Sequence, residues 1–307
     1  MNANDFVLGI DLGGTKMALG TADASGTILH RQVVPTLAEQ GADQAIARAI
    51  ATGRQLVDQT QEERSGELAG VGVANMGITL EDRVLMAPNV PGLDRLALPQ
   101  MMRQAFSTDK VRIENDVKAA ASAELRWGAL AGVDVGIYLN LGTGIATALV
   151  VYGRVLRGAH GAAGEIAYNL RQIHEEVGVR HDRAPLEEFV GGRAIGERAS
   201  LQFGEPSTAA EIFHRAQSDP EARAFVEATL TEIAFHVTNL AIALDPERIV
   251  VGGGLMRSKD VILPRLAAHL KRFVPFPPTL LEAHFSRDAG LMGAIALAFP
   301  APNTKSP

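Results

Sequence analysis

The sequence contains no cysteine in its 307 residues. Disulfide bonds, thiol nucleophiles and zinc sites built on thiolates are therefore excluded. Long apolar runs are also missing, since none approaches the roughly 20 residues that a membrane-spanning helix needs. The first five residues lack the basic segment and the apolar stretch of a secretory signal peptide. We therefore expect a cytoplasmic protein without a membrane partner.

A marked excess of either charge is absent too. The chain has 29 Lys and Arg against 35 Asp and Glu, a formal net charge of −6, and its basic residues are scattered. We expect no nucleic-acid partner, because proteins that bind nucleic acid concentrate basic residues on one surface. The length exceeds what one hydrophobic core usually serves. Two lobes that bind a small molecule are the natural expectation.

Strands and helices alternate along the chain, which predicts the α/β class. Short runs rich in Val, Ile and Leu predict strands, and longer stretches with helical spacing predict helices. Pro264 falls within one such helix and is expected in its first turn or at a kink. The predicted strands are 6–10, 17–22, 27–34, 68–74, 111–113, 135–141, 145–152, 154–156 and 248–251, and the predicted helices are 42–59, 117–127, 221–243, 259–272 and 289–299.

One structural unit recurs within the chain. Ile10-Asp-Leu-Gly-Gly-Thr and Leu139-Asn-Leu-Gly-Thr-Gly each follow a strand and lead into a second strand. A repeat at this long spacing indicates a duplicated domain, whereas solenoids have much shorter periods. The alternative is that strand, glycine turn and strand recur by chance, as they can in any α/β protein.

The first glycine turn, Asp11-Leu-Gly-Gly-Thr-Lys16, has the groups that a nucleotide phosphate needs. Backbone N–H groups and an ammonium suit phosphate, and a carboxylate suits a hydrated Mg²⁺ on that phosphate. The segment is not a P-loop, because Lys16 follows the threonine and the chain continues as a strand. The alternative interpretation is a plain hairpin turn.

Two further glycine turns end apolar strands, at Gly142-Thr-Gly144 and Gly252-Gly-Gly254. Neither completes the dinucleotide-binding pattern G-x-G-x-x-G, because position 147 is Thr and position 257 is Arg. Each turn alone is a weak signal. The three together favour a nucleotide held between two lobes.

Two acidic segments are candidates for chemistry on a hydroxyl group. In Glu114-Asn-Asp116, Asp116 is either a helix cap or a general base, and Asn115 could hold a sugar hydroxyl through its amide. In Gly161-Ala-Ala-Gly-Glu165, the carboxylate of Glu165 could accept hydrogen bonds from adjacent hydroxyls or could simply be solvated.

These segments, in this order, resemble the ROK family (repressors, open reading frames and sugar kinases) of the hexokinase–actin superfamily, from about Val7 to Ala298. The similarity rests on six motifs in the family's order. They are Asp11-Leu-Gly-Gly-Thr-Lys16, Ala87-Pro-Asn89 with Pro91-Gly92, Glu114-Asn-Asp-Val-Lys-Ala-Ala-Ala121, Leu141-Gly-Thr-Gly-Ile145, Gly158-Ala-x-Gly-x-Ala-Gly-Glu-Ile166 and Ile249-Val-Val-Gly-Gly-Gly254.

The resemblance implies a role for each matching position. Asp116 would be the catalytic base that acts on the sugar, and Asp11 would contact Mg²⁺ through water. The other sugar-binding positions would be Gly77, Asn89, Asn115, Glu165 and Glu187, and Tyr168, which replaces a family residue, is a further candidate. The ATP positions would be Gly14, Thr15, Lys16, Gly142, Thr143, Gly144, Gly253 and Gly254.

The chain departs from the family in one place. Most members have a His after the Gly-Glu pair and then a cysteine-rich loop that binds structural zinc, but here Tyr168 stands where that His is expected. His174 and His181 lie in this loop without further matched ligands, so no zinc is expected. Glu187 in Pro185-Leu-Glu-Glu-Phe189 still matches the glutamate that reaches the sugar in the family.

The resemblance implies two actin-like, ribonuclease H-like lobes with a ligand cleft between them. The first lobe would be 1–114, with the helix 289–300 packing back on it, and the second 115–288. The implied activity is ATP-dependent phosphorylation of a hexose at its 6-hydroxyl, with glucose as the first expectation. Fructose, mannose and N-acylated hexosamines stay open as acceptors, as does polyphosphate in place of ATP. A homodimer is expected.

A sugar-sensing regulator without catalytic activity is the alternative from another class. Repressors of this family have a helix-turn-helix before the first phosphate motif, and only five residues precede Phe6 here, too few for a DNA-binding module. A sugar-binding protein without activity would have no reason to keep Asp116 together with Asp11 and Lys16. The sequence therefore favours a kinase.

Overall fold

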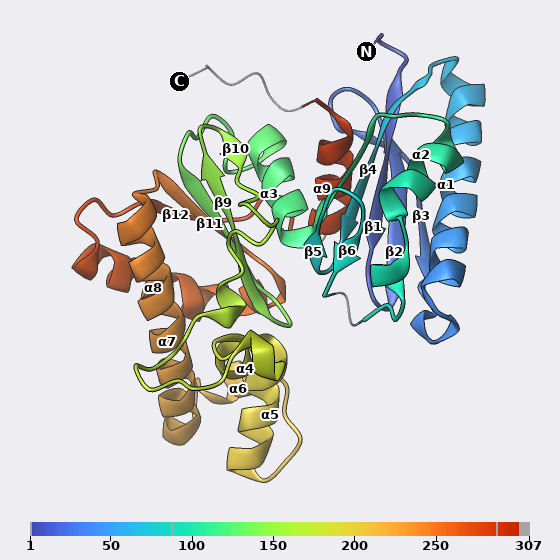
Figure 1. The fold of residues 1–307 in the computed structure, drawn as a ribbon. Helices are drawn as coiled ribbons and strands as arrows, with labels where there is room; N and C mark the ends of the chain where they lie inside the picture. Colours follow the sequence, from blue (N-terminus) through green and yellow to red (C-terminus); the bar gives the residue numbers. More distant parts are fainter. Residues whose placement is uncertain (1, 87–88, 287, 301–307) are drawn as a thin grey trace. The chain divides into compact units, whose positions relative to one another are not determined.

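The computed structural model describes residues 2–86, 89–286 and 288–300. The chain forms two compact units, the first made of residues 1–131, 154–163 and 287–307, the second of 132–153 and 164–286. Two five-stranded sheets are the main scaffolds, drawn in Figure 1. Among the described residues, no helix is both long enough and apolar enough to cross a membrane.

The sheet of the first unit has the strand order β3-β2-β1-β4-β7. The strands β1, β2 and β3 pair antiparallel, whereas β4 runs parallel to both β1 and β7. The parallel strands bring the ends of β1, β4 and β7 to one edge. The bounds are β1 Phe6–Leu12, β2 Lys16–Ala22, β3 Ile28–Pro35, β4 Leu68–Asn75 and β7 Val111–Asn115, with a separate hairpin of β5 Ile78–Thr79 and β6 Val84–Leu85.

Helices cover both faces of this sheet because successive strand residues point to opposite sides. Leu8 of β1 belongs to the core that includes Ile46 of α1, whereas Gly9 faces Ile295 of α9. The close approach of α9 requires glycine, since a Cβ on Gly72 would lie 1.8 Å from the Ala294 carbonyl oxygen. The helices are α1 Ala42–Arg64, α2 Leu98–Phe106, α3 Asp116–Trp127 and α9 Ala289–Ala298, with short 3₁₀ turns η1 Ala38–Gln40 and η2 Leu93–Arg95.

The second sheet has the strand order β10-β9-β8-β11-β12. Its strands β8 and β9 form an antiparallel hairpin, and β11 runs parallel to β8 and β12. The strands are β8 Gly136–Leu141, β9 Ile145–Val151, β10 Arg154–Val155, β11 Arg248–Gly252 and β12 Thr279–Glu282. In each sheet a glycine turn joins the first two strands in the sequence, β1 to β2 and β8 to β9, as the repeated motif predicted.

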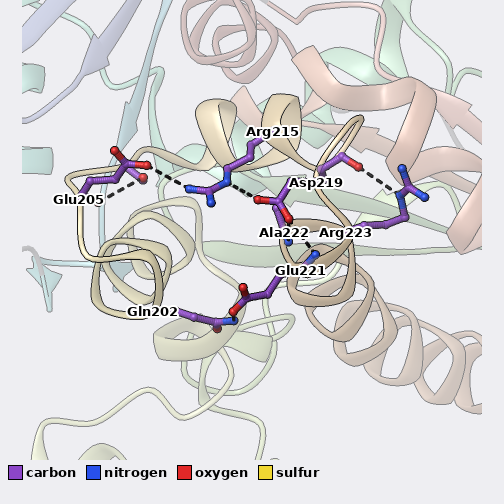
Figure 2. A network of polar contacts seen from close by, with 9 residues as sticks. Gln202, Glu205, Arg215, Asp219, Glu221, Ala222 and Arg223 are labelled. Atoms are coloured by element: carbon purple, nitrogen blue, oxygen red, sulfur yellow. Dashed lines mark hydrogen bonds and ion pairs between the residues drawn. The ribbon is translucent and has the colours of Figure 1, made fainter.

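Helices of the second unit share one hydrophobic core with this sheet. Arg215 at the end of α6 binds Asp219, which precedes α7, at 2.6 Å. The same guanidinium binds Glu205, which precedes α6, at 3.0 Å, as Figure 2 shows. Asp219 also caps α7 by accepting from the Glu221 amide. The elements are η3 Ile166–Tyr168, η4 Val179–His181, α4 Glu187–Val190, α5 Gly192–Phe203, α6 Ala209–Arg215, α7 Pro220–Leu244, η5 Gly254–Ser258 and α8 Lys259–Phe273.

The α/β class predicted from the sequence is confirmed by this architecture. Helix α8 runs through Pro264, whose ring lies inside the helix instead of in its first turn. The compact first unit continues past the predicted lobe boundary at 114/115, as far as Ala131. Helix α3 stays with this unit because it packs on α9, where a Cβ on Gly293 would lie 2.5 Å from the Ala119 carbonyl carbon.

Candidate active site

Asp11 lies near the end of β1, with its carboxylate against the first turn of α9. A Cβ on Gly290 would lie 2.3 Å from an Asp11 carboxylate oxygen, so only glycine leaves room for that carboxylate. Burial, and after it the negative charge of Asp116, raise the pKa of Asp11 to about 6, although Lys16 lowers it in part. A partly buried carboxylate of this kind suits a hydrated Mg²⁺.

Thr36 stabilises the glycine turn after β1 through two hydrogen bonds. The Thr36 hydroxyl donates to the Gly13 carbonyl at 2.6 Å, and its amide donates to the Thr15 carbonyl at 2.9 Å. The side chains of Thr15 and Lys16 remain exposed. The turn therefore presents a hydroxyl and an ammonium to solvent, as a phosphate site requires.

Asn89 lies directly beside this turn. A Cβ on Gly14 would lie 3.0 Å from the Asn89 Cβ, and the Asn89 amide nitrogen donates to the Met76 sulfur at 3.2 Å. One phosphate candidate and one sugar candidate therefore occupy neighbouring positions in the first unit. The residues before Asn89 in the same motif, Ala87 and Pro88, lie outside the described residues.

The junction of β7 and α3 places Asn115 and Asp116 at a helix N-terminus. Asn115 is the N-cap, since its side-chain oxygen accepts from the amides of Val117 at 3.0 Å and Lys118 at 3.3 Å. Its amide nitrogen donates to the Gly77 carbonyl at 3.0 Å. The Asn115 side chain is thus oriented by α3 on one side and by Gly77 on the other. Asp116 follows in the first turn, where the helix dipole favours a negative charge.

An ion pair that sequence reasoning missed supports this junction. The buried carboxylate of Glu114 accepts from the Arg157 guanidinium at 2.8 Å, and Arg157 also donates to the Thr79 carbonyl at 2.8 Å. Burial raises the pKa of Glu114, and the charge of Arg157 opposes that rise. The pair joins β7 to the loop before the sugar motif. No local pattern identifies it, because the two residues lie far apart in the sequence.

In the second unit, Glu187 of α4 contacts the glycine turn after β8. A Glu187 carboxylate oxygen accepts from the Ile145 amide at 3.1 Å, and a Cβ on Gly144 would lie 1.9 Å from that oxygen. A predicted sugar ligand therefore lies against a predicted phosphate turn. The Gly142 carbonyl also accepts from the Gly192 amide at 3.0 Å, which ties the same turn to α5.

Glu165 is the N-cap of the short turn η3, and Tyr168 is the last residue of that turn. The preceding residue, Gly164, is fixed by Thr147, whose amide and hydroxyl both donate to its carbonyl at 2.9 Å. Burial raises the pKa of Tyr168, with smaller contributions from the charges of Glu165 and Glu187. The three predicted sugar ligands of this unit are therefore close enough to interact.

The predicted adenosine turn follows β11. Gly253 adopts a φ of 95°, and a Cβ there would lie 2.4 Å from the Leu141 carbonyl oxygen, so this position requires glycine. Around Gly254 nothing lies within 4 Å of a hypothetical Cβ. The turn is therefore packed against the end of β8 on one side and open on the other.

The predicted site residues fall into two groups, one in each unit. A cavity of about 250 Å³ lies elsewhere in the second unit and is lined by residues such as Glu205, Glu211 and Arg215, none of them a predicted ligand. Among the described residues, no group of three or more His, Asp or Glu side chains is arranged to hold a metal ion. The first-unit group is Asp11, Gly14, Thr15, Lys16, Gly77, Asn89, Asn115 and Asp116, and the second-unit group is Gly142, Thr143, Gly144, Glu165, Tyr168, Glu187, Gly253 and Gly254.

The chain is similar to curated sugar kinases over most of its length. It is 31% identical over 294 residues to an N-acetylmannosamine kinase of Haemophilus influenzae (strain PittGG), covering 94% of this chain and 93% of that protein. It is 29% identical over 295 residues to an N-acetylmannosamine kinase of Escherichia coli O7:K1 (strain IAI39 / ExPEC), covering 95% of this chain and 97% of that protein.

Solved structures give the same result for the fold. The ROK hexokinase from Thermus thermophilus superposes with a TM-score of 0.81 at 30% identity, over 95% of this chain and 97% of that one. A ROK family glucokinase from Streptomyces griseus, in complex with glucose and AMPPNP, gives 0.73 at 26% identity, over 95% of this chain and 99% of that one. The predicted fold of two actin-like lobes is confirmed by these matches. The family model described as ROK family matches residues 7–300, and the chain belongs to the ROK family.

Proposed function

We propose that this protein transfers the terminal phosphoryl group of ATP to the 6-hydroxyl of a hexose or an N-acylated hexosamine, with Asp116 as the general base. The chain is a sugar kinase, in line with relatives that match nearly all of it. The position of Asp116 supports the finer proposal most directly. It stands in the first turn of α3, beside a sugar candidate, Asn115, and within electrostatic reach of the metal candidate, Asp11.

The proposed reaction requires little covalent chemistry from the protein. Phosphoryl transfer depends on positioning, on neutralising charge at the phosphates and on taking a proton from the attacking hydroxyl. Asp116 would accept that proton, and the backbone amides and Lys16 of the first glycine turn would bind phosphate oxygens. Mg²⁺, held through water by Asp11, would supply charge neutralisation at the phosphates.

Each unit has its own candidates for hydrogen bonds to the acceptor sugar. Asn89, Gly77 and Asn115 are the candidates in the first unit, with Asn115 already oriented by its bonds to α3 and Gly77. In the second unit, Glu165 and Glu187 would accept from sugar hydroxyls, since bonds to a charged acceptor are stronger than neutral ones.

We place N-acetylmannosamine first among the acceptors to be tested. The sequence alone favoured glucose, and the relatives named above include N-acetylmannosamine kinases as well as a hexokinase and a glucokinase. Glucose therefore stays as the second candidate. Mannose, fructose and N-acetylglucosamine complete the set of acceptors.

A coupled assay of ADP release, run over this set of sugars with ATP and Mg²⁺, tests the proposal. We expect turnover with at least one sugar, highest with N-acetylmannosamine, and a 6-phosphate product by NMR. Asp58→Asn, on an exposed position of α1, is the matched control for substitutions of Asp116. Release of ADP that no sugar stimulates, or a product phosphorylated at another hydroxyl, would contradict the proposal.

A further inference from the structure

The segment from Asn169 to Leu186 joins two of the proposed sugar ligands, Tyr168 and Glu187. Its one regular element is the short turn η4, and its Ile173 side chain is 95% exposed. Ordering such a segment costs conformational entropy, so both of its ends need specific contacts to stay in place. The position of each sugar ligand therefore depends on how the adjoining end of this segment is fixed.

The start of the segment is bound to α7 by two polar contacts. The Asn169 amide nitrogen lies 3.2 Å from His236 Nδ1, and Arg171 Nε donates to a Glu232 carboxylate oxygen at 2.9 Å. Glu232 and His236 are four residues apart on α7, so they occupy the same face of the helix. This face of α7 thus fixes the chain just after Tyr168.

The same arginine also reaches the far end of the segment. The Arg171 guanidinium lies over the Phe189 ring, 3.5 Å from its centroid, and Arg198 lies 3.6 Å from it. Arg198 in turn donates to the Phe189 carbonyl at 2.7 Å and to the Thr229 hydroxyl of α7 at 3.3 Å. Phe189 belongs to α4, the helix that begins at Glu187. Arg171 therefore contacts α7 and α4 at once.

The electrostatics of this cluster favour the pairing of Arg171 with Glu232. Burial, and after it the charge of Arg171, lower the pKa of Arg198 to about 10, so the Arg198 guanidinium stays charged near neutral pH. Burial lowers the pKa of His236, whose Nε2 lies 3.6 Å from the same Glu232 oxygen. The lowered pKa disfavours the protonated imidazole of His236, and Arg171 is the cation that lies closest to this Glu232 oxygen, at 2.9 Å.

We propose that Arg171 is a positioning residue for the sugar site, which fastens both ends of the 169–186 segment and so holds Tyr168 and Glu187 in place. This inference rests on the proposed function for its sugar-binding part. Arg171 does not contact the reacting groups, and its effect passes through the residues at either end of the segment.

Three substitutions separate the contributions of the side chain. Arg171→Met keeps the length but removes the charge, Arg171→Lys keeps the charge without the planar stacking on Phe189, and Glu232→Gln removes the acceptor charge. Arg265→Met is the matched control, because Arg265 pairs with another glutamate of α7, Glu227, at 3.4 Å.

Hydrogen–deuterium exchange without sugar measures the anchoring, and steady-state kinetics measure its effect on sugar binding. We expect faster exchange of 169–186 in Arg171→Met and Glu232→Gln, with Arg171→Lys between them and the wild type, and no change in the control. The KM for sugar should rise about tenfold in Arg171→Met, as when one charge-assisted hydrogen bond is lost. The kcat and the KM for ATP should stay within about twofold of the wild type.

Either of two results would overturn the inference. Unchanged exchange of 169–186 in Arg171→Met would show that the segment is not anchored there, even if the wild type phosphorylates no sugar in the set. A fall in kcat in step with a fall in Tm, with the KM for sugar unaltered, would indicate a merely structural role. Absence of turnover in the wild type contradicts the proposed function alone, since the exchange result is read without activity.

Discussion

Asp11 and Asp116 are two carboxylates whose charges oppose each other in the first unit. Burial and then the charge of Asp116 raise the pKa of Asp11 to about 6 from its usual value of 3.8. The folded protein therefore disfavours the ionised form of Asp11. A bound cation near Asp11 would relieve this unfavourable interaction, which links the stability of the site to its proposed metal.

Replacing Asp11 with Asn should stabilise the metal-free protein at neutral and higher pH. Because the pKa of Asp11 is raised in the folded state, ionised Asp11 lowers the free energy of unfolding by its full amount above pH 6. This loss declines as the pH falls through 6 and is absent below about 4. A difference between 3.8 and about 6 corresponds to about 3 kcal/mol at most. Urea denaturation in EDTA should show a higher free energy of unfolding for Asp11→Asn than for the wild type at pH 8, and no difference at pH 4.

Asp58→Asn, which removes an exposed carboxylate from α1, provides the control for net charge. The same gain in both variants would attribute the effect to net charge. Equal stability of Asp11→Asn and the wild type at pH 8 would show that Asp11 is not held in an unfavourable ionised state.

Substitution of Gly144 by Ala should impair the kinase through Glu187. The new methyl group would lie 1.9 Å from the Glu187 carboxylate oxygen, so Glu187 must move and give up its bond to the Ile145 amide. We expect higher KM values for both sugar and ATP, measured by initial rates. Gly178→Ala is the control, since nothing lies within 4 Å of a Cβ there and the backbone is extended.

The sugar ligands of the second unit should differ in importance. Glu165→Gln replaces a charged acceptor with a neutral one and should raise the KM for sugar strongly. Tyr168→Phe should weaken the binding free energy of the sugar by about 1 kcal/mol, as expected if one hydroxyl hydrogen bond is lost. Sugar titrations of both variants decide this, with Tyr152→Phe at an exposed tyrosine as the control. An unaltered KM in Glu165→Gln would place the sugar on another loop.

Removing Arg157 alone should destabilise the fold more than removing both Arg157 and the charge of its partner, Glu114. Arg157→Met leaves the buried Glu114 carboxylate without its cation, and we expect a loss of about 1–2 kcal/mol, because Arg157 is half exposed. The double variant with Glu114→Gln should recover part of this loss. Arg31→Met, in the more exposed pair with Asp288, should cost less. Additive losses in the double variant would show that the two residues are not coupled.

The parts of the site that the sequence predicts are those built from neighbouring residues. A strand, a glycine turn and a second strand are adjacent in the chain, so the turns after β1 and β8 could be located at once. The capping residue was harder to choose, because Asn115 and Asp116 can both cap a helix. The choice depends on where β7 ends, and Asn115 takes the role.

Contacts between distant residues could not be predicted in this way. Arg157 contacts Glu114, and Arg171 contacts Glu232, only in the folded protein, because each pair is far apart in the sequence. The room for the Asp11 carboxylate likewise depends on Gly290, near the other end of the chain. A single sequence shows each of these residues as an ordinary surface arginine or helix glycine, and only packing gives them a role.

The role of Asp116 as general base is tested most directly by comparing Asp116→Asn with the wild type, in single-turnover phosphorylation and in sugar binding by calorimetry. Asn keeps the shape and the hydrogen-bonding capacity but cannot accept the proton. Loss of a general base typically lowers the rate on the order of 10²–10⁴-fold, so we predict a fall of that size with sugar affinity nearly unaltered. Near-normal turnover in Asp116→Asn would contradict the account.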